Sequence, residues 1–165
     1  AQAKNAVFIT IDDIDSFSLV KGEKTSDVGH LSEEETKEGF KKIIREDGSF
    51  KDWGGERSDL YSTRIIFKGK RIPSAVAFKG RGTTGKLVPA KMGKNGDQIS
   101  RLFTEPAELF LIVYKGQIDS TVISQMRAFA IGAAMGGQKI YYGVVDGSDL
   151  GRIVSAYPNA FRQLK

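Results

Sequence analysis

The stretch "DLYSTRIIFKGKRIPSAVAFK", residues 59–79, decides the fold. Two runs rich in β-branched and aromatic residues flank the turn "GKRIP" (69–73), a pattern typical of a β-hairpin. The two-residue period of a strand predicts that Ala75, Ala77 and Lys79 share one face of the returning strand. On the outgoing strand the same period groups Asp59 with Tyr61, Thr63, Ile65 and Phe67.

The rest of the chain alternates between predicted strands and helices. The apolar run "ELFLIVY" (108–114) is typical of a central strand that is buried on both faces. A helix is predicted over 33–46, with Ser32 as its N-cap and Glu35 completing a capping box. The remaining predicted elements are strands at 6–11 and 139–145 and helices at 97–103, 119–137 and 148–157. We therefore expect an α/β fold whose mixed sheet joins a hairpin to parallel strands and is flanked by helices.

The composition limits the chemistry that the chain can perform. It has no cysteine and a single histidine, His30, which excludes disulfides, thiolate nucleophiles and Cys/His zinc sites. Catalysis would depend on carboxylates, lysines, hydroxyls or a hard cation such as Mg²⁺. The formal charge of +5 favours anionic partners.

The length and hydropathy pattern predict one domain over residues 1–165, with residues 1–30 as a candidate N-terminal extension. No apolar run reaches the roughly 18 residues of a membrane span, and the N-terminus turns acidic too early for a secretory signal. We therefore expect no membrane partner and an intracellular, cytoplasmic location.

The segment "FKGRGTTGKL" (78–87) has the spacing G-x-x-x-x-G-K of a nucleotide-binding P-loop. A P-loop lysine is followed by Ser or Thr, whereas Lys86 is followed by Leu87. The loop should also open into a helix, but Val88 and Pro89 follow instead. The sequence therefore indicates a basic glycine loop after a strand, and excludes a P-loop.

Asp59 and Lys79 stand on adjacent strands of the hairpin, where a carboxylate and a lysine of like parity would meet. Together with "SD" at 58–59, "AFK" at 77–79 and Gln98 in the next helix, this arrangement resembles the PD-(D/E)XK nuclease superfamily over about residues 33–145. The resemblance implies a restriction-endonuclease-like fold and a Mg²⁺- or Mn²⁺-dependent phosphodiesterase. It also implies that Asp59 and the Phe78 carbonyl hold the metal, Lys79 orients the water or stabilises charge, and Gln98 steadies the water or a ligand.

The sequence departs from this family at two positions. Ala77 stands where the family has its second acid, and Ser58 stands where it has proline. We favour Glu38 or Glu56 as the displaced acid. Other candidates are Glu33, Glu34, Glu35 and Asp97. Two alternatives stay open: the chain is a relic that binds without cutting, or Ala77 replaces an acid in an inactivated variant.

Basic residues surround the predicted site. The glycine-rich loop over residues 80–97, called the glycine loop below, carries Arg81, Lys86, Lys91 and Lys94, and the hairpin turn adds Lys70 and Arg71. Such residues neutralise phosphates and release counterions from a duplex. We therefore expect a DNA endonuclease, with an inactive nucleic-acid-binding module of the same fold as the alternative. Since such enzymes often dimerise to cut both strands, a homodimer is also open.

A separate motif, "DDID" (12–15), follows the predicted strand 6–11. It resembles the Asp-x-Asp of haloacid-dehalogenase-like phosphatases, which implies phosphate-ester hydrolysis as a third reading. Phe17 stands where that family has Thr or Val.

Overall fold

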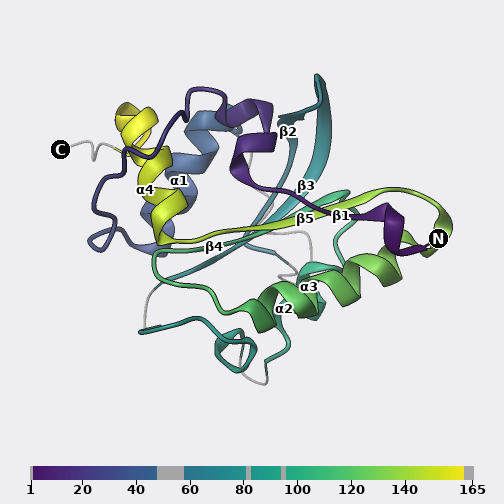
Figure 1. The fold of residues 1–165 in the computed structure, drawn as a ribbon. Coiled ribbons are helices and arrows are strands. Elements are labelled where there is room, and N and C mark those ends of the chain that lie inside the picture. The colour runs from purple at the N-terminus through teal and green to yellow at the C-terminus, as the bar shows by residue number, and fades with distance from the viewer. Residues whose placement is uncertain (1, 48–57, 81–82, 94–95, 162–165) are drawn as a thin grey trace.

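The computed structural model describes residues 2–47, 58–80, 83–93 and 96–161. Its centre is a five-stranded mixed sheet in the order β1-β5-β4-β3-β2 (Figure 1). The strands are Ala6–Phe8 (β1), Leu60–Phe67 (β2), Lys70–Lys79 (β3), Leu109–Tyr114 (β4) and Ile140–Val145 (β5). β1, β5, β4 and β3 are parallel, and β2 is antiparallel to β3. The predicted α/β class and the mixed sheet are confirmed.

Helices cover both faces of this sheet. They are Glu33–Ile44 (α1), Gln98–Leu102 (α2), Ser120–Ala133 (α3) and Gly147–Ala156 (α4). α1 and α4 lie on one face and α2 and α3 on the other (Figure 1). Every residue of β4 is buried, and its side chains alternate between the two apolar clusters that these helices cover. The prediction of a strand buried on both faces is therefore confirmed.

The first long helix begins where the sequence predicts. Ser32 Oγ accepts from Glu35 N at 3.0 Å, and Glu35 Oε1 accepts from Ser32 N at 3.1 Å, so the capping box is present. The helix ends at Ile44, two residues before the predicted end, because Arg45 is left-handed with φ of 61°. Among the described residues, no helix has the length and apolar character needed to cross a bilayer.

Strand β2 contains a β-bulge that the sequence pattern does not predict. The β2–β3 register shifts between Ser62 and Ile65. Tyr61 pairs with Ala75, on the face of α2, whereas Ile65 belongs to the cluster under α1 and α4. The prediction that the alternate residues from Tyr61 to Phe67 share one face is therefore wrong, because an inserted residue reverses the side-chain alternation.

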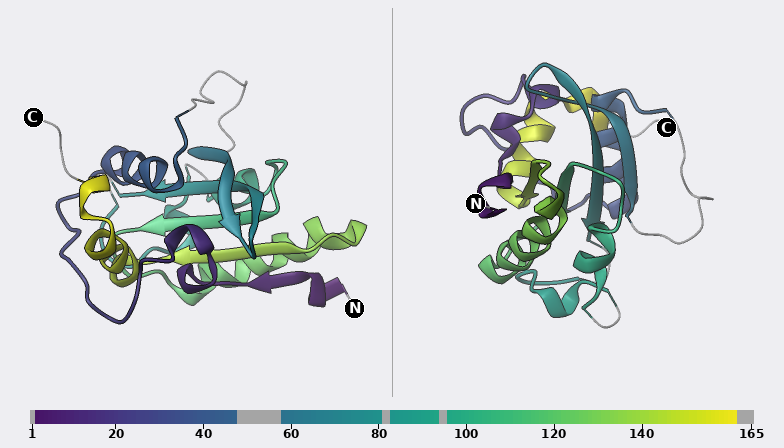
Figure 2. Two further views of the ribbon diagram at one scale, coloured as in Figure 1. Left: turned by 90° about the horizontal axis from the view of Figure 1, so that it is seen from above. Right: turned by 90° about the vertical axis from the view of Figure 1, so that its right-hand side faces the viewer.

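The N-terminal segment is part of the same sheet and core. β1 ends at Phe8, sooner than the predicted 6–11, because Thr10 caps a short 3₁₀ turn, Ile11–Asp13. Buried apolar side chains follow it at Ile9, Ile11, Ile14, Phe17, Val20, Val28 and Leu31. The far end of the hairpin bends toward this segment (Figure 2), and Phe67 bridges to Ile14. Residues 1–30, considered above as an extension, thus supply an edge strand and core side chains.

The packing of β1 against β5 leads to a prediction about Gly143. A Cβ at this buried position would stand 2.3 Å from Ile9 O, a backbone atom that cannot rotate away. Gly143→Ala should therefore lower the free energy of unfolding by about 2 kcal/mol or more, measured by urea denaturation.

Gly132 on α3 is the matched control, because a Cβ there meets nothing within 4 Å. Gly132→Ala should stabilise the protein by about 0.5–1 kcal/mol through helix propensity. Equal effects of the two substitutions would contradict the close approach of β1 to β5.

Candidate functional site

The predicted site lies at one edge of the sheet, where each of the five strands has one of its ends. The carboxyl ends of β1, β5, β4 and β3 lie there because these strands are parallel, and antiparallel β2 begins there. Lys79 ends β3 at this edge, paired in register with Tyr114, which ends β4. Ligands of open α/β sheets bind outside the carboxyl ends of the strands, so this edge is the candidate site.

Asp59 lies against β3 at this edge. Its Oδ2 accepts a hydrogen bond from Phe78 N at 2.7 Å, and its own amide donates to Val76 O at 3.1 Å. Extending the β2–β3 register by one residue sets Asp59 opposite Ala77, on the face to which Lys79 also belongs. The carboxylate thus contacts the residue that precedes Lys79.

The Phe78 carbonyl is directed toward the same side of β3 as Asp59. In a strand, the N–H and C=O of one residue point toward the same neighbouring strand. Because Phe78 N donates to Asp59, the Phe78 carbonyl also faces the β2 side. A carboxylate and a carbonyl oxygen therefore lie on one side of β3.

The face below Lys79 is filled by side chains. Ala75 and Ala77 are 0 % and 1 % exposed and belong to an apolar cluster with Ile99 and Leu102 of α2. These small residues leave no room for a ligand on this face, because α2 packs directly against them. Any ligand must therefore approach Lys79 from the edge of the sheet.

Gln98 begins α2, half-buried, above the same face of the sheet. The loop after α2 is tied to the start of β2: Ser58 Oγ donates to the Glu105 carboxylate, and Tyr61 OH donates to Pro106 O at 2.9 Å. These contacts hold the short helix of Gln98 beside the strand that Asp59 precedes.

The predicted displaced acids differ in their placement. Glu38 lies on α1, which covers the opposite face, and its Oε1 is 3.7 Å from Lys41 Nζ. This placement makes Glu38 a poor candidate, because Lys79 belongs to the face of α2. Glu33, at the N-terminus of α1, lies closer to the edge: its Cγ would be 3.2 Å from a Cβ at Gly80, the residue after Lys79. Glu56 lies outside the described residues.

Asp59 and the Phe78 carbonyl supply oxygen ligands, which Mg²⁺ and Mn²⁺ prefer. Mg²⁺ commonly takes one or two protein carboxylates and completes its shell with water and substrate phosphate. In the part of the chain that the structure describes, no three His, Cys, Asp or Glu side chains are grouped to hold a metal. The described donors therefore fit a Mg²⁺ site that substrate completes, and do not fit one enclosed by protein carboxylates.

The predicted basic patch is divided by the fold. Lys70 and Arg71 begin β3, so about 30 Å of strand separates them from Lys79, and their assignment to one patch is wrong. Lys86 Nζ is 3.0 Å from Asp119 Oδ1, and its side chain remains 53 % exposed. Arg81 and Lys94 lie outside the described residues.

Residues 84–86 of the glycine loop are held by two side chains whose roles the sequence analysis missed. Lys91 Nζ donates to Thr84 O at 2.8 Å and Lys86 O at 3.0 Å, so this predicted DNA contact braces the loop. Tyr114 OH donates to Gly85 O at 2.7 Å. An aromatic hydroxyl at the end of a buried strand was the available signal, since such a group requires a hydrogen-bond partner.

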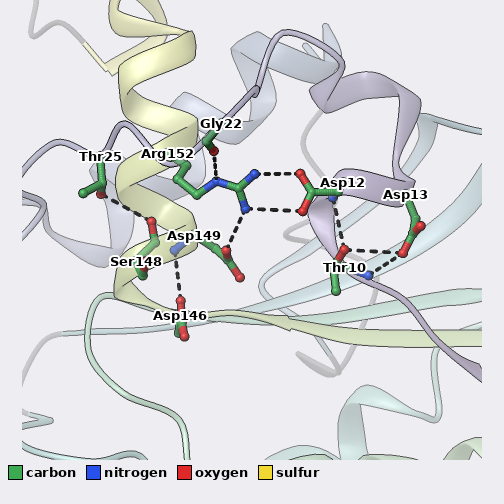
Figure 3. Close-up of polar contacts among 9 residues, drawn as sticks. All are labelled: Thr10, Asp12, Asp13, Gly22, Thr25, Asp146, Ser148, Asp149 and Arg152. Carbon is green, nitrogen blue, oxygen red and sulfur yellow. Dashed lines mark hydrogen bonds and ion pairs between the residues drawn. The ribbon is translucent and has the colours of Figure 1, made fainter.

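All three acids of "DDID" are engaged in structural contacts, and Figure 3 shows those of Asp12 and Asp13. Asp12 forms a bidentate ion pair with Arg152, whose Nη2 lies 2.7 Å from Oδ1 and whose Nη1 lies 3.3 Å from Oδ2. Asp13 Oδ2 accepts from Thr10 N at 2.9 Å, and Asp15 Oδ2 accepts from Gly69 N at 2.7 Å. The motif therefore fastens the N-terminal segment to α4 and the hairpin turn, which disfavours the phosphatase reading.

Arg152 is the centre of this network. It also donates to Gly22 O at 3.0 Å and to Asp149 at 3.2 Å (Figure 3). Its bonds to Asp12 and Asp149 raise the pKa of Arg152, and burial together with Asp146 raises the pKa of Asp149. These contacts join the loop before α1 to α4, far along the chain.

Comparisons of the chain with protein-family models, with curated proteins and with solved structures give no match. The function is therefore argued from the geometry of the site.

Asp119 provides a pH-dependent test of how the loop is held. Hydrogen bonds from Thr121 and Lys86 lower the pKa of Asp119 to about 2 from 3.8. A lowered folded-state pKa contributes stability above pH 3.8 that is lost as the pH falls through about 2. Asp119→Asn keeps an N-cap side chain but removes the charge. It should lower the melting temperature slightly at pH 7, and the difference should shrink below pH 3.8 and vanish only below about pH 2.

The control is Asp47→Asn, which removes an exposed carboxylate beyond the end of α1. A melting-temperature difference for Asp119→Asn that persists unchanged into strong acid would show that the charge is not its cause.

Proposed function

We propose that this chain is a metal-dependent DNA endonuclease with a restriction-endonuclease-like fold of the PD-(D/E)XK type. The observation that carries the proposal is the hydrogen bond from Phe78 N to Asp59 Oδ2 at 2.7 Å. This contact sets the carboxylate of Asp59, the residue before β2, beside Phe78, the residue before Lys79 on β3. Asp59 and Lys79, twenty positions apart in the sequence, are thereby brought to the same end of the sheet.

The order of elements also supports the proposal. Helix α1, the β2–β3 hairpin, helix α2 and strand β4 follow one another, and β4 runs parallel to β3. The resemblance implies this same succession around an acid and a lysine. The family's meander has one more strand before this hairpin, and the described residues between α1 and β2 do not contain it.

The proposed phosphodiester hydrolysis depends on the metal ligands and the lysine at the sheet edge. A bound Mg²⁺ or Mn²⁺ would be held by Asp59 and the Phe78 carbonyl, and would supply charge neutralisation and a more acidic water. The Lys79 ammonium stabilises negative charge on the phosphate or orients the attacking water. Gln98 hydrogen-bonds the water or a ligand, and Glu33 is the described carboxylate best placed to complete the site. The net charge of +5 favours DNA approach.

The direct test is cleavage of supercoiled plasmid with Mg²⁺ or Mn²⁺. Asp59→Asn retains an acceptor for Phe78 N but loses the charge, and Lys79→Met retains the apolar stem. Each should lower the cleavage rate about a hundredfold or more, with duplex binding changed far less.

Asp13→Asn is the control, since Asp13 lies in the structural "DDID" motif. It should cleave at the wild-type rate. If both Asp59→Asn and Lys79→Met cleave at the wild-type rate, the assignment of Asp59 and Lys79 to the catalytic site is wrong.

A second candidate is an inactive nucleic-acid-binding module, and Ala77 favours it. Ala77 occupies the position of the family's second acid and is 1 % exposed. If wild type binds DNA without cutting, Ala77→Glu tests whether only this acid is missing. Metal-dependent cleavage gained by Ala77→Glu would support an inactivated nuclease. A folded Ala77→Glu protein that still only binds would support the module.

A further inference from the structure

The ammonium group of Lys91 forms hydrogen bonds with backbone carbonyls of the same chain. Its Nζ donates to Thr84 O at 2.8 Å and to Lys86 O at 3.0 Å. Lys91 itself is fixed by a 3₁₀ turn, Pro89–Lys91, and by a hydrogen bond from its amide to Val88 O at 3.0 Å. Two carbonyl groups of the glycine loop are therefore turned toward one cation.

The neighbouring carbonyls are held by Tyr114. Its hydroxyl lies 2.7 Å from Gly85 O and 3.4 Å from Thr83 O. The two ends of the stretch are also fixed, because Thr83 N donates to Gly80 O at 3.1 Å and Leu87 N to Gln117 O at 2.8 Å. The conformation of residues 83–87 is thus defined by contacts at every residue.

These carbonyl directions determine where the amides point. In a trans peptide group, the C=O of one residue and the N–H of the next point in opposite directions. Since Thr84 O faces Lys91, the Gly85 N–H points away from Lys91. Since Gly85 O faces Tyr114, the Lys86 N–H points away from that hydroxyl. Gly85 has φ of 70°, and a left-handed residue is one half of the αR-αL turn in which successive amides form a concave anion site.

We propose that the Gly85 and Lys86 amides form a backbone binding site for a phosphate group, and that Lys91 is the positioning residue that holds it open. Successive N–H groups of such a turn make a concave anion site. Both residues are exposed, so the site is accessible. The choice of a DNA phosphodiester as the occupant rests on the proposed function, because Tyr114 anchors the loop beside its register partner Lys79.

The local charges favour an anion. Lys86 is paired with Asp119 at 3.0 Å, so that lysine is partly neutralised. The two hydrogen bonds of Lys91 go to neutral carbonyl oxygens, which leave its positive charge in place behind the loop. A phosphate at the amides would therefore meet backbone dipoles in front and a fixed cation behind them.

The test uses the full chain, labelled with ¹⁵N and titrated without divalent ions. One titration uses inorganic phosphate and the other a short DNA duplex. The amide protons of Gly85 and Lys86 should move downfield with both probes. Lys91→Met should abolish these shifts and weaken duplex binding roughly tenfold, which corresponds to about 1.4 kcal/mol.

Two lysine variants distinguish positioning from simple loss of charge. Lys86→Met keeps both amides and should keep their shifts. Lys139→Met removes an exposed lysine before β5 and should leave the shifts and the duplex affinity close to wild type. If Lys91→Met does not fold, Gly85→Ala replaces it, because alanine is strained at φ of 70° and should also remove the shifts.

The outcomes separate this site from the proposed endonuclease. Amides that stay unmoved by both probes, or shifts that persist at wild-type affinity in Lys91→Met, overturn the phosphate site. Shifts with phosphate but not with duplex support the site and overturn DNA as its occupant. Shifts with both probes but no metal-dependent cleavage support the site and count against the endonuclease.

Discussion

Strand β4 imposes the constraint on which the rest of the structure depends. All six of its residues are buried, so its backbone groups have no water to bond and must pair on both sides. β3 and β5 satisfy them in parallel. Parallel neighbours need crossovers, and α2 and α3 supply these on one face while α1 and α4 cover the other. The layers therefore follow from one apolar strand of six residues.

The same pairing explains why candidate chemistry gathers at one edge. Parallel register sets Lys79 beside Tyr114 at the strand ends. The antiparallel β2 then begins at this edge, which allows Asp59 to reach the Phe78 amide. Tyr114 in turn holds the glycine loop through Gly85. Asp59, Lys79 and residues 83–87 therefore gather at one end of the sheet because of how three strands are aligned.

Charged side chains divide into those that support the fold and those at the candidate site. Arg152 and Asp12 join segments 140 residues apart in the sequence, and they act as a structural clamp. Lys91 also has a structural task, since it orients carbonyl groups of the loop. Asp59 and Lys79 stand where β3 ends, at the edge that a ligand can approach, and the Asp59 carboxylate also accepts a hydrogen bond from Phe78 N. Residue type alone did not separate these two groups.

The sequence by itself determined the element order, the capping box of α1, the hairpin and the buried strand, because these depend on local periodicity and short-range hydrogen bonds. It also placed Asp59 and Lys79 on one hairpin. Only the tertiary structure decided the bulge after Ser62, the engagement of "DDID" with Arg152 and the bracing role of Lys91. Each of these depends on a partner that is distant in the chain or on a backbone direction set by folding. The local sequence pattern around a charged residue does not identify its distant contact partner. That partner determines whether the side chain stabilises the fold or remains available to a ligand.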